Sequence, residues 1–170
     1  DPRWAIAFKF PPTTRTTKLL GIEINVGRTG ALNPFAELEP VEVGGVIVRH
    51  ATLHNEEDIN RKDIRVGDTV IVQRAGDVIP QVIGPVLEDR TGKEVPFRMP
   101  ANCPACGEPV VKNEEDAKHF CVNPKCPSRD VEGIKHFISR SAMDIDGVGE
   151  KLVDRLYELE LIRRASDLYA

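Results

Sequence analysis

Four cysteines lie close together in the sequence, as two pairs separated by 14 residues. Cys103 and Cys106 form a Cys-x2-Cys pair, and Cys121 and Cys126 form a Cys-x4-Cys pair. Two such pairs offer four thiolates to one ion, which is the ligand set of a zinc site. Because four thiolates leave no coordination position for water, we expect a Zn²⁺ ion with a structural role rather than a catalytic one.

Two other interpretations of this cluster stay open. The cysteines could be free and buried, or His119 could replace one of the thiolates. A disulfide framework is disfavoured, because the N-terminus lacks the layout of a secretory signal and thiols in the cytoplasm stay reduced. No apolar run approaches the ~20 residues that a membrane span needs. We therefore expect a cytoplasmic protein without membrane contact.

A glycine-containing segment at residues 144–150, Asp-Ile-Asp-Gly-Val-Gly-Glu, is a second candidate site. Gly147 and Gly149 lack side chains, so backbone N–H groups there can approach a phosphate closely. The helix expected after them adds its partial positive N-terminus, and Lys151 adds a full charge. Helix, turn and helix together predict a helix-hairpin-helix that binds a nucleic-acid backbone without reading its sequence. The alternative is an ordinary helical turn that requires glycine.

Two further segments carry arginines between predicted strands. The first is Gly27-Arg28-Thr29-Gly30, and the second runs from Arg74 to Ile79. Both arginines can donate charge-assisted hydrogen bonds to phosphates, although an arginine in a turn is often only solvated. Val78 and Ile79 have two interpretations: they belong to the hydrophobic core, or they pack on a minor groove beside a distorted base step.

Composition limits the remaining classes. The chain has 170 residues, a net charge of −4 and only 5% aromatic residues. This composition argues against a protein that coats nucleic acid non-specifically or stacks many bases on aromatic side chains. No Walker loop, Gly-x-Ser-x-Gly or His-Glu-x-x-His motif occurs. The sequence therefore predicts no complete catalytic constellation.

The elements that must position these groups are mainly strands. Residues 13–98 alternate short β-rich runs with Gly and Pro, with Gly44-Gly45 expected as a bend inside the third strand. Asn55 can cap a short helix between the third and fourth strands. That order predicts a five-stranded barrel of the oligonucleotide-binding (OB) fold, whereas an SH3-type barrel would not need the helix. The five expected strands cover residues 16–26, 31–40, 41–50, 69–74 and 78–87.

The pattern predicts four parts. Residues 1–12 form a lone strand that belongs to a preceding domain, residues 13–98 the OB-fold, residues 99–128 the zinc finger, and residues 129–170 a helical segment. The zinc finger is too short to build a core unaided, so the ion must supply much of its folding free energy. The helical segment has two apolar faces, the first with Val131, Ile134, Phe137 and Ile138, and the second with Leu152, Leu156 and Leu159.

Seven motifs in order resemble one family, the bacterial NAD-dependent DNA ligases, across the whole chain. No single motif is decisive, but their order and intervals leave little room for coincidence. The motifs are Arg3-Trp-Ala-Ile-Ala-Phe-Lys-Phe-Pro11, Val26-Gly-Arg-Thr-Gly30, Leu38-Glu-Pro-Val41, Ala51-Thr-Leu-His-Asn55, Arg74-Ala-Gly-Asp-Val-Ile-Pro80, the four cysteines, and Ala142-Met-Asp-Ile-Asp-Gly-Val-Gly149.

The resemblance implies roles for several residues. Residues 1–12 would end the nucleotidyltransferase domain, where Lys9 would lie against the nucleotide and its phosphates. The two arginine segments would grip nicked duplex DNA, with Val78 and Ile79 on its minor-groove side. The cysteines would bind zinc, and the glycine hairpin would begin a set of helix-hairpin-helix units. The whole enzyme would use NAD and Mg²⁺ to seal nicks in replication and repair, as a monomer.

The chain departs from the family in what it lacks. The family's nucleophile is a lysine in a Lys-x-Asp-Gly motif, and aspartate stands in its place in Asp144-Ile-Asp-Gly147. We therefore expect a fragment that is inactive alone and works with an adenylation domain of the same chain. The alternative is a free-standing module of OB-fold and zinc finger that binds single-stranded nucleic acid without catalysis.

Overall fold

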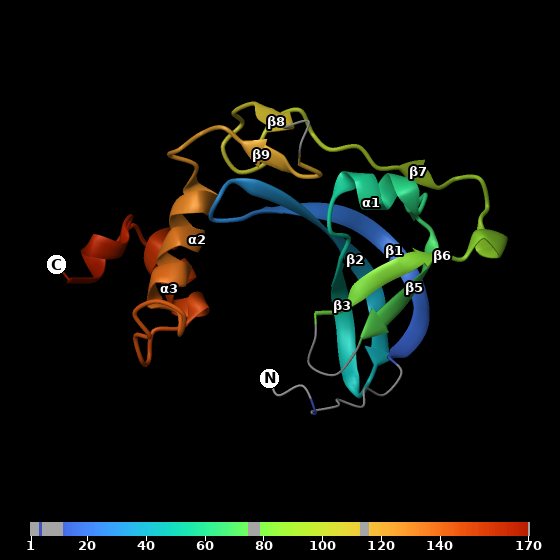
Figure 1. Ribbon diagram of the computed structural model, residues 1–170, viewed down its shortest axis with the longest axis horizontal. Helices are drawn as coiled ribbons and strands as arrows, with labels where there is room; N and C mark the ends of the chain where they lie inside the picture. The colour runs from blue at the N-terminus through green and yellow to red at the C-terminus, as the bar shows by residue number, and fades with distance from the viewer. Residues whose placement is uncertain (1–3, 5–11, 75–78, 113–115, 170) are drawn as a thin grey trace. The chain divides into compact units, whose positions relative to one another are not determined.

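The computed structural model describes residues 4, 12–74, 79–112 and 116–169 (Figure 1). Contacts divide the chain into two units, Asp1–Glu23 with Pro34–Arg98, and Ile24–Asn33 with Met99–Ala170. Among the described residues, the first unit encloses one hydrophobic cluster and the second unit encloses two smaller ones. The strand expected at residues 1–12, with its Lys9, lies outside the described residues apart from Trp4 and Pro12.

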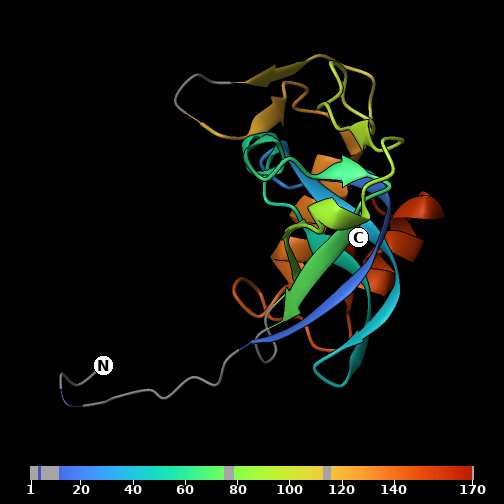
Figure 2. The same ribbon diagram turned by 90° about the vertical axis from the view of Figure 1, so that its right-hand side faces the viewer.

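Five strands surround the core of the first unit, and their arrangement agrees with the predicted OB-fold. They are hydrogen-bonded in the order β1-β5-β6-β3-β2, and β1 also pairs with β2, so that the order returns to its first strand. Neighbours are antiparallel except β3 and β6, which meet in parallel at Thr52 and Gln81. Figure 2 shows the strong twist of the long strand β1 beside β5. The bounds are β1 Thr13–Val26, β2 Ala31–Val43, β3 Val46–Thr52, β5 Thr69–Arg74 and β6 Gln81–Pro85.

The turn between β2 and β3 corrects one expectation. Gly44 and Gly45 are not a bend inside a strand but the turn itself, with φ of 59° and 80°. Two successive positive φ values suit a tight hairpin turn, and glycine adopts them without steric cost. β2 instead continues through Pro40, which the sequence pattern took as a strand end. The pairing with β3 shifts register between Glu37 and Val41, and such an irregularity tolerates a residue without an N–H.

The short helix α1 (Glu56–Arg61) confirms the expected cap between the third and fourth main strands. The Asn55 side chain accepts a hydrogen bond from the Asp58 N–H at 2.8 Å, which satisfies one of the free donors of the first turn. Ile59 is fully buried and anchors the helix in the core of the first unit. The helix is thus fixed at one end by a polar cap and along one face by burial.

A polar network fastens the chain beyond β6. The carboxylate of Asp68 is wholly buried and accepts two hydrogen bonds from the Arg90 guanidinium, at 2.8 and 2.9 Å. Asp68 also accepts from the Arg65 N–H at 2.7 Å, and Arg90 donates to the exposed Asp63 at 2.6 Å. The small sheet of β4 (Arg65–Val66) and β7 (Val95–Pro96) flanks this network, and the 3-10 turn Leu87–Asp89 precedes Arg90. The sequence pattern predicted none of these elements.

The second unit begins with the ends of β1 and β2, which extend beyond the first core. Val26 and Leu32 from these ends are buried together with Cys103, Cys121 and Cys126. β9 (His119–Cys121) pairs with β2 at Ala31 and Leu32, and β8 (Val110–Lys112) pairs with β9. The four-cysteine segment therefore does not stand alone, because a strand pair from residues 24–33 supplies apolar side chains to its core.

Helices complete the second unit. α2 (Pro127–Ile138) and α3 (Glu150–Glu158) pack around Ile134, Ile138 and Val153, with the 3-10 turn Ala165–Tyr169 alongside. The face expected for α2 is confirmed at Ile134 and Ile138, but the face expected for α3 is wrong at its ends. Leu152 and Leu159 are 42% and 50% exposed, and Val153 is the buried residue instead. None of the helices in the described part of the chain is long and apolar enough to cross a membrane.

Candidate metal centre and nucleic-acid interface

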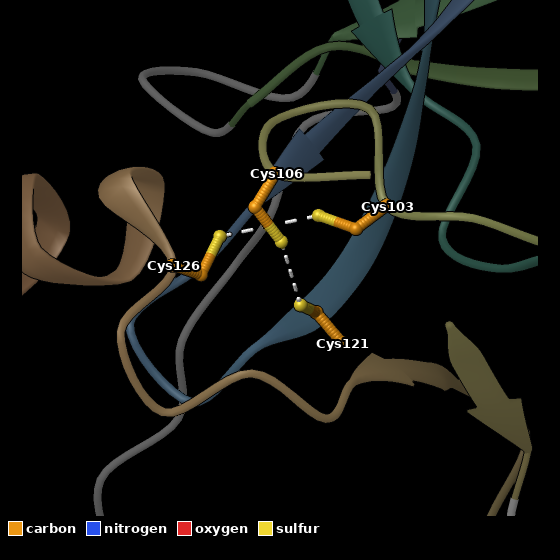
Figure 3. Close-up of side chains that lie close together, drawn as sticks. All are labelled: Cys103, Cys106, Cys121 and Cys126. Carbon is orange, nitrogen blue, oxygen red and sulfur yellow. Dashed lines mark hydrogen bonds between the residues drawn. The ribbon is translucent and has the colours of Figure 1, made fainter. Parts of the chain in front are cut away.

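The four cysteine sulfurs converge on one point, as Figure 3 shows. All four lie within 4.8 Å of one another, with 3.9 Å between Cys103 and Cys126 and 3.5 Å between Cys106 and Cys121. Four sulfurs at about 2.3 Å from a tetrahedral zinc ion are about 3.8 Å apart. The observed cluster therefore fits Zn²⁺ with four thiolate ligands, and the predicted set needs no contribution from His119.

The surroundings of the sulfurs explain why a cation belongs there. Cys103, Cys121 and Cys126 are buried, and Cys106 is partly exposed. Burial raises the pKa of the Cys121 thiol to about 12 and raises the pKa of Cys126, so without a cation both would keep their protons. The Glu108 N–H donates to the Cys106 sulfur and lowers its pKa to about 7. A divalent cation would replace the thiol protons and would stabilise this buried polar cluster.

Two chain turns present the cysteine pairs. The Gly107 N–H donates to the Cys103 carbonyl at 2.8 Å, and the Cys103 N–H donates to the Glu108 carbonyl at 2.8 Å. Gly107 has a φ of 75°, which a turn returning to the same ion requires. At the second pair, Cys126 is the N-cap of α2 and its N–H donates to Asn123. The zinc site is thus the start of the helical segment.

The glycine hairpin lines a pocket of about 480 Å³ in the second unit. Gly147 has a φ of 77° and needs glycine for its backbone. Gly149, the N-cap of α3, has an ordinary φ of −91°, and a Cβ atom there would meet nothing within 4 Å. Because Ser, Asp or Asn caps a helix at least as well as glycine, the described chain gives no reason of its own for a bare backbone at this position.

The charges of this pocket come from several residues. Lys151 follows the hairpin, is exposed, and makes no ion pair within the described residues. Arg140 lines the pocket from the end of α2, a residue that the sequence pattern did not single out. Lys135 lines it too but is engaged by Glu132 and Asp154 at 3.1 and 2.8 Å. Three carboxylates line the same pocket, from Asp144, Asp146 and Glu150.

The 27–30 turn presents its arginine outward. The Gly30 N–H donates to the Gly27 carbonyl at 2.8 Å and closes the turn, while Arg28 and Thr29 are exposed. Among the residues that the structure describes, Arg28 has no hydrogen-bond or ion-pair partner. Its guanidinium is therefore available to a ligand of this surface.

The second arginine segment is described only at its ends, because Val78 lies outside the described residues. Arg74 ends β5, and its guanidinium is 3.5 Å from the Gly44 carbonyl. Ile79 is 73% exposed, so the interpretation as a core residue is wrong for this side chain. Arg74 and Ile79 belong to the first unit and Arg28 to the second, so their contact with one duplex stays a prediction.

Comparison with known proteins identifies both domains. Residues 16–94 match the NAD-dependent DNA ligase OB-fold domain, and residues 102–127 match the NAD-dependent DNA ligase C4 zinc finger domain. Proteins named DNA ligase from Listeria innocua serovar 6a, Bacillus cereus strain B4264 and Desulfosudis oleivorans are 54%, 53% and 56% identical to this chain, over 99%, 100% and 99% of its length. The chain spans 25% of the length of each. It therefore belongs to the NAD-dependent DNA ligase family, whose OB-fold and C4 zinc finger domains it contains.

Proposed function

We propose that this chain is the DNA-binding central part of a ligase that joins a 3′-hydroxyl and a 5′-phosphate at nicks in duplex DNA, in replication and repair. The observation that supports it best is the hairpin at Gly147 and Gly149. Gly149 leaves open space above the backbone N–H groups at the start of α3, where the helix dipole is positive. A phosphate of a DNA backbone would fit this space and the positive end of the helix, and Arg140 would counter part of the charge of the three carboxylates in the same pocket.

Exposed cations elsewhere in the chain would add further contacts to DNA. Arg28 and Lys151 are without partners in the described chain and would meet further phosphates of the same duplex. Thr29 has an exposed hydroxyl group that would do the same. In the first unit, Arg74 would contact a phosphate, while the exposed Ile79, with Val78, would pack on the minor groove beside the nick.

The covalent chemistry would belong to an adenylation domain of the same chain. NAD supplies the adenylyl group when it is bound there, together with Mg²⁺. Lys9 would lie against the nucleotide, where its charge would offset the negative charge that develops as adenylate passes to the 5′-phosphate. The zinc ion would have a structural role only, because four thiolates occupy all its positions.

Substitution of Gly149 tests the phosphate contact. Gly149→Ala should lower the affinity for nicked duplex about three- to tenfold, because a methyl group then stands over the N–H groups that the phosphate needs. The free energy of unfolding should change by about 1 kcal/mol or less, since the backbone is unstrained and the space is open. Gly133→Ala, in the middle of α2 and equally open, is the matched control for the same chemical change. Equal affinities of the two variants would contradict the proposed contact.

A second experiment separates the ligase from the alternative, a module for single-stranded nucleic acid. The chain is added to a matching adenylated nucleotidyltransferase domain, and sealing of a nicked duplex is measured by gel electrophoresis. We expect a gain in sealing, and tighter binding of nicked duplex than of a single strand of equal length. Tighter binding of the single strand without any gain in sealing would favour the alternative.

A further inference from the structure

The metal lobe, which comprises the described residues of the four-cysteine segment (99–112 and 116–128), is joined to the 27–30 turn by direct hydrogen bonds. The Cys121 N–H donates to the Gly30 carbonyl at 2.9 Å, next to the pairing of Ala31 with Phe120. Cys121 therefore has two tasks, since its sulfur belongs to the metal cluster and its backbone holds the turn. The same residue that offers a sulfur to the metal is thus hydrogen-bonded directly to the turn.

Side-chain packing makes the same connection. Val26 and Leu32, on either side of the turn, are 2% and 0% exposed and are buried with three of the four cysteines. These two residues lie far from the cysteines in sequence, and the contacts of residues 24–33 place them in the second unit. The core beneath the turn is thus the core of the metal site.

Gly30 lies in direct contact with the four-cysteine segment. It is buried, and its φ is 86°. A Cβ atom there would lie 2.8 Å from the Cys121 carbonyl oxygen and 3.4 Å from the Arg129 side chain. Real Cβ atoms do not approach a backbone oxygen so closely, so any side chain at this position must push the turn and the metal lobe apart.

We propose that the metal lobe holds the DNA-contacting 27–30 turn in position, and that Gly30 is the positioning residue that joins the turn to the lobe. The ordered metal lobe fixes the backbone of the turn on one side, through Gly30, and leaves Arg28 exposed on the other. The zinc ion then contributes to DNA affinity without touching DNA, because it fixes the direction in which Arg28 points. This inference rests on the proposed function in one respect, the contact of Arg28 with a phosphate.

Binding measurements test the connection by a double-mutant cycle. Arg28→Ala should lower the affinity for nicked duplex about tenfold at low salt and reduce the slope of log K against log salt by about one. Gly30→Ala should have a similar effect although it removes no charge. The double variant should be no worse than either single variant, because both lose the same contact. Gly133→Ala is again the control and should bind as the unsubstituted chain does.

Hydrogen exchange tests, without DNA, whether the metal lobe holds the turn in position. Removal of the metal by a chelator should speed exchange of the Gly27, Gly30 and Cys121 amides, whose hydrogen bonds hold the turn, by at least tenfold. The amides of Val70 and Val72, in the core of the first unit, should keep their protection. This measurement stands even where Gly30→Ala fails to fold.

The outcomes separate the two proposals. If the turn amides exchange at the same rate with and without metal, the metal lobe does not hold the turn in position, regardless of the effect of Arg28→Ala on DNA affinity. Additive losses in the double-mutant cycle would lead to the same conclusion. If Arg28→Ala binds DNA normally while exchange of the turn amides depends on the metal, the DNA contact of Arg28 in the proposed function is wrong. The inference that the metal lobe holds the turn then still stands.

Discussion

The two units reach stability by different means. Among the described residues, the first has one core cluster of twelve buried residues, enclosed by five strands and covered by a helix. The second has two smaller clusters, one of which is made largely of cysteines. Burial of apolar area grows with the size of a core, and a short segment without a large core needs another source of free energy. A metal ion held by the four cysteines would therefore supply free energy of folding that the small cores of the second unit do not.

Metal removal should have the largest effect and should divide the two units. A chelator should abolish hydrogen-exchange protection in residues 99–128 and in the ends of β1 and β2, because the cluster of buried thiolates then loses the cation that its folding requires. The first unit should keep its protection and its unfolding transition. Loss of protection in both units together would show that they unfold as one cooperative unit. Unaltered protection in the second unit would contradict the zinc assignment.

In the first unit, the buried carboxylate of Asp68 offers the next largest effect. Arg90→Leu should lower the free energy of unfolding by about 3–5 kcal/mol, because the buried side chain of Asp68 would lose its guanidinium partner. Denaturant unfolding of this unit measures the change. Arg61→Leu is the control, since Arg61 is 72% exposed and its ion pair with Asp58 should contribute less than about 1 kcal/mol. Equal effects of the two substitutions would mean that the network contributes no more than a surface pair.

The helices of the second unit offer the smallest effect. Val153→Ala should cost about 2 kcal/mol, because Val153 is fully buried between the helices. Leu152→Ala, at the neighbouring exposed position, should change the stability by about 0.5 kcal/mol or less. Thermal unfolding of the metal-loaded chain measures both. The reverse order would restore the helix face that the spacing of leucines predicts.

Features that depend on neighbouring residues could be predicted well. The two cysteine pairs, the Asn55 cap and the turn at residues 27–30 each depend on chemistry within a few residues, which the sequence displays directly. Errors arose where local signals conflict. Pro40 indicated a strand end, but a register shift absorbs it, so the turn moved to Gly44 and Gly45. In α3, leucines four and three apart matched a helical period as well as the observed face did.

The sequence by itself determined the two cysteine pairs, the order of the five main strands along the chain and the family, because spacing and residue type carry that information. Only the tertiary structure decided that residues 24–33 belong to the metal-binding unit, that Asp68 is buried against Arg90, and that Gly30 touches Cys121. Each of these pairings joins residues more than twenty positions apart. Such contacts depend on how the whole chain folds, and no short stretch of residues specifies them.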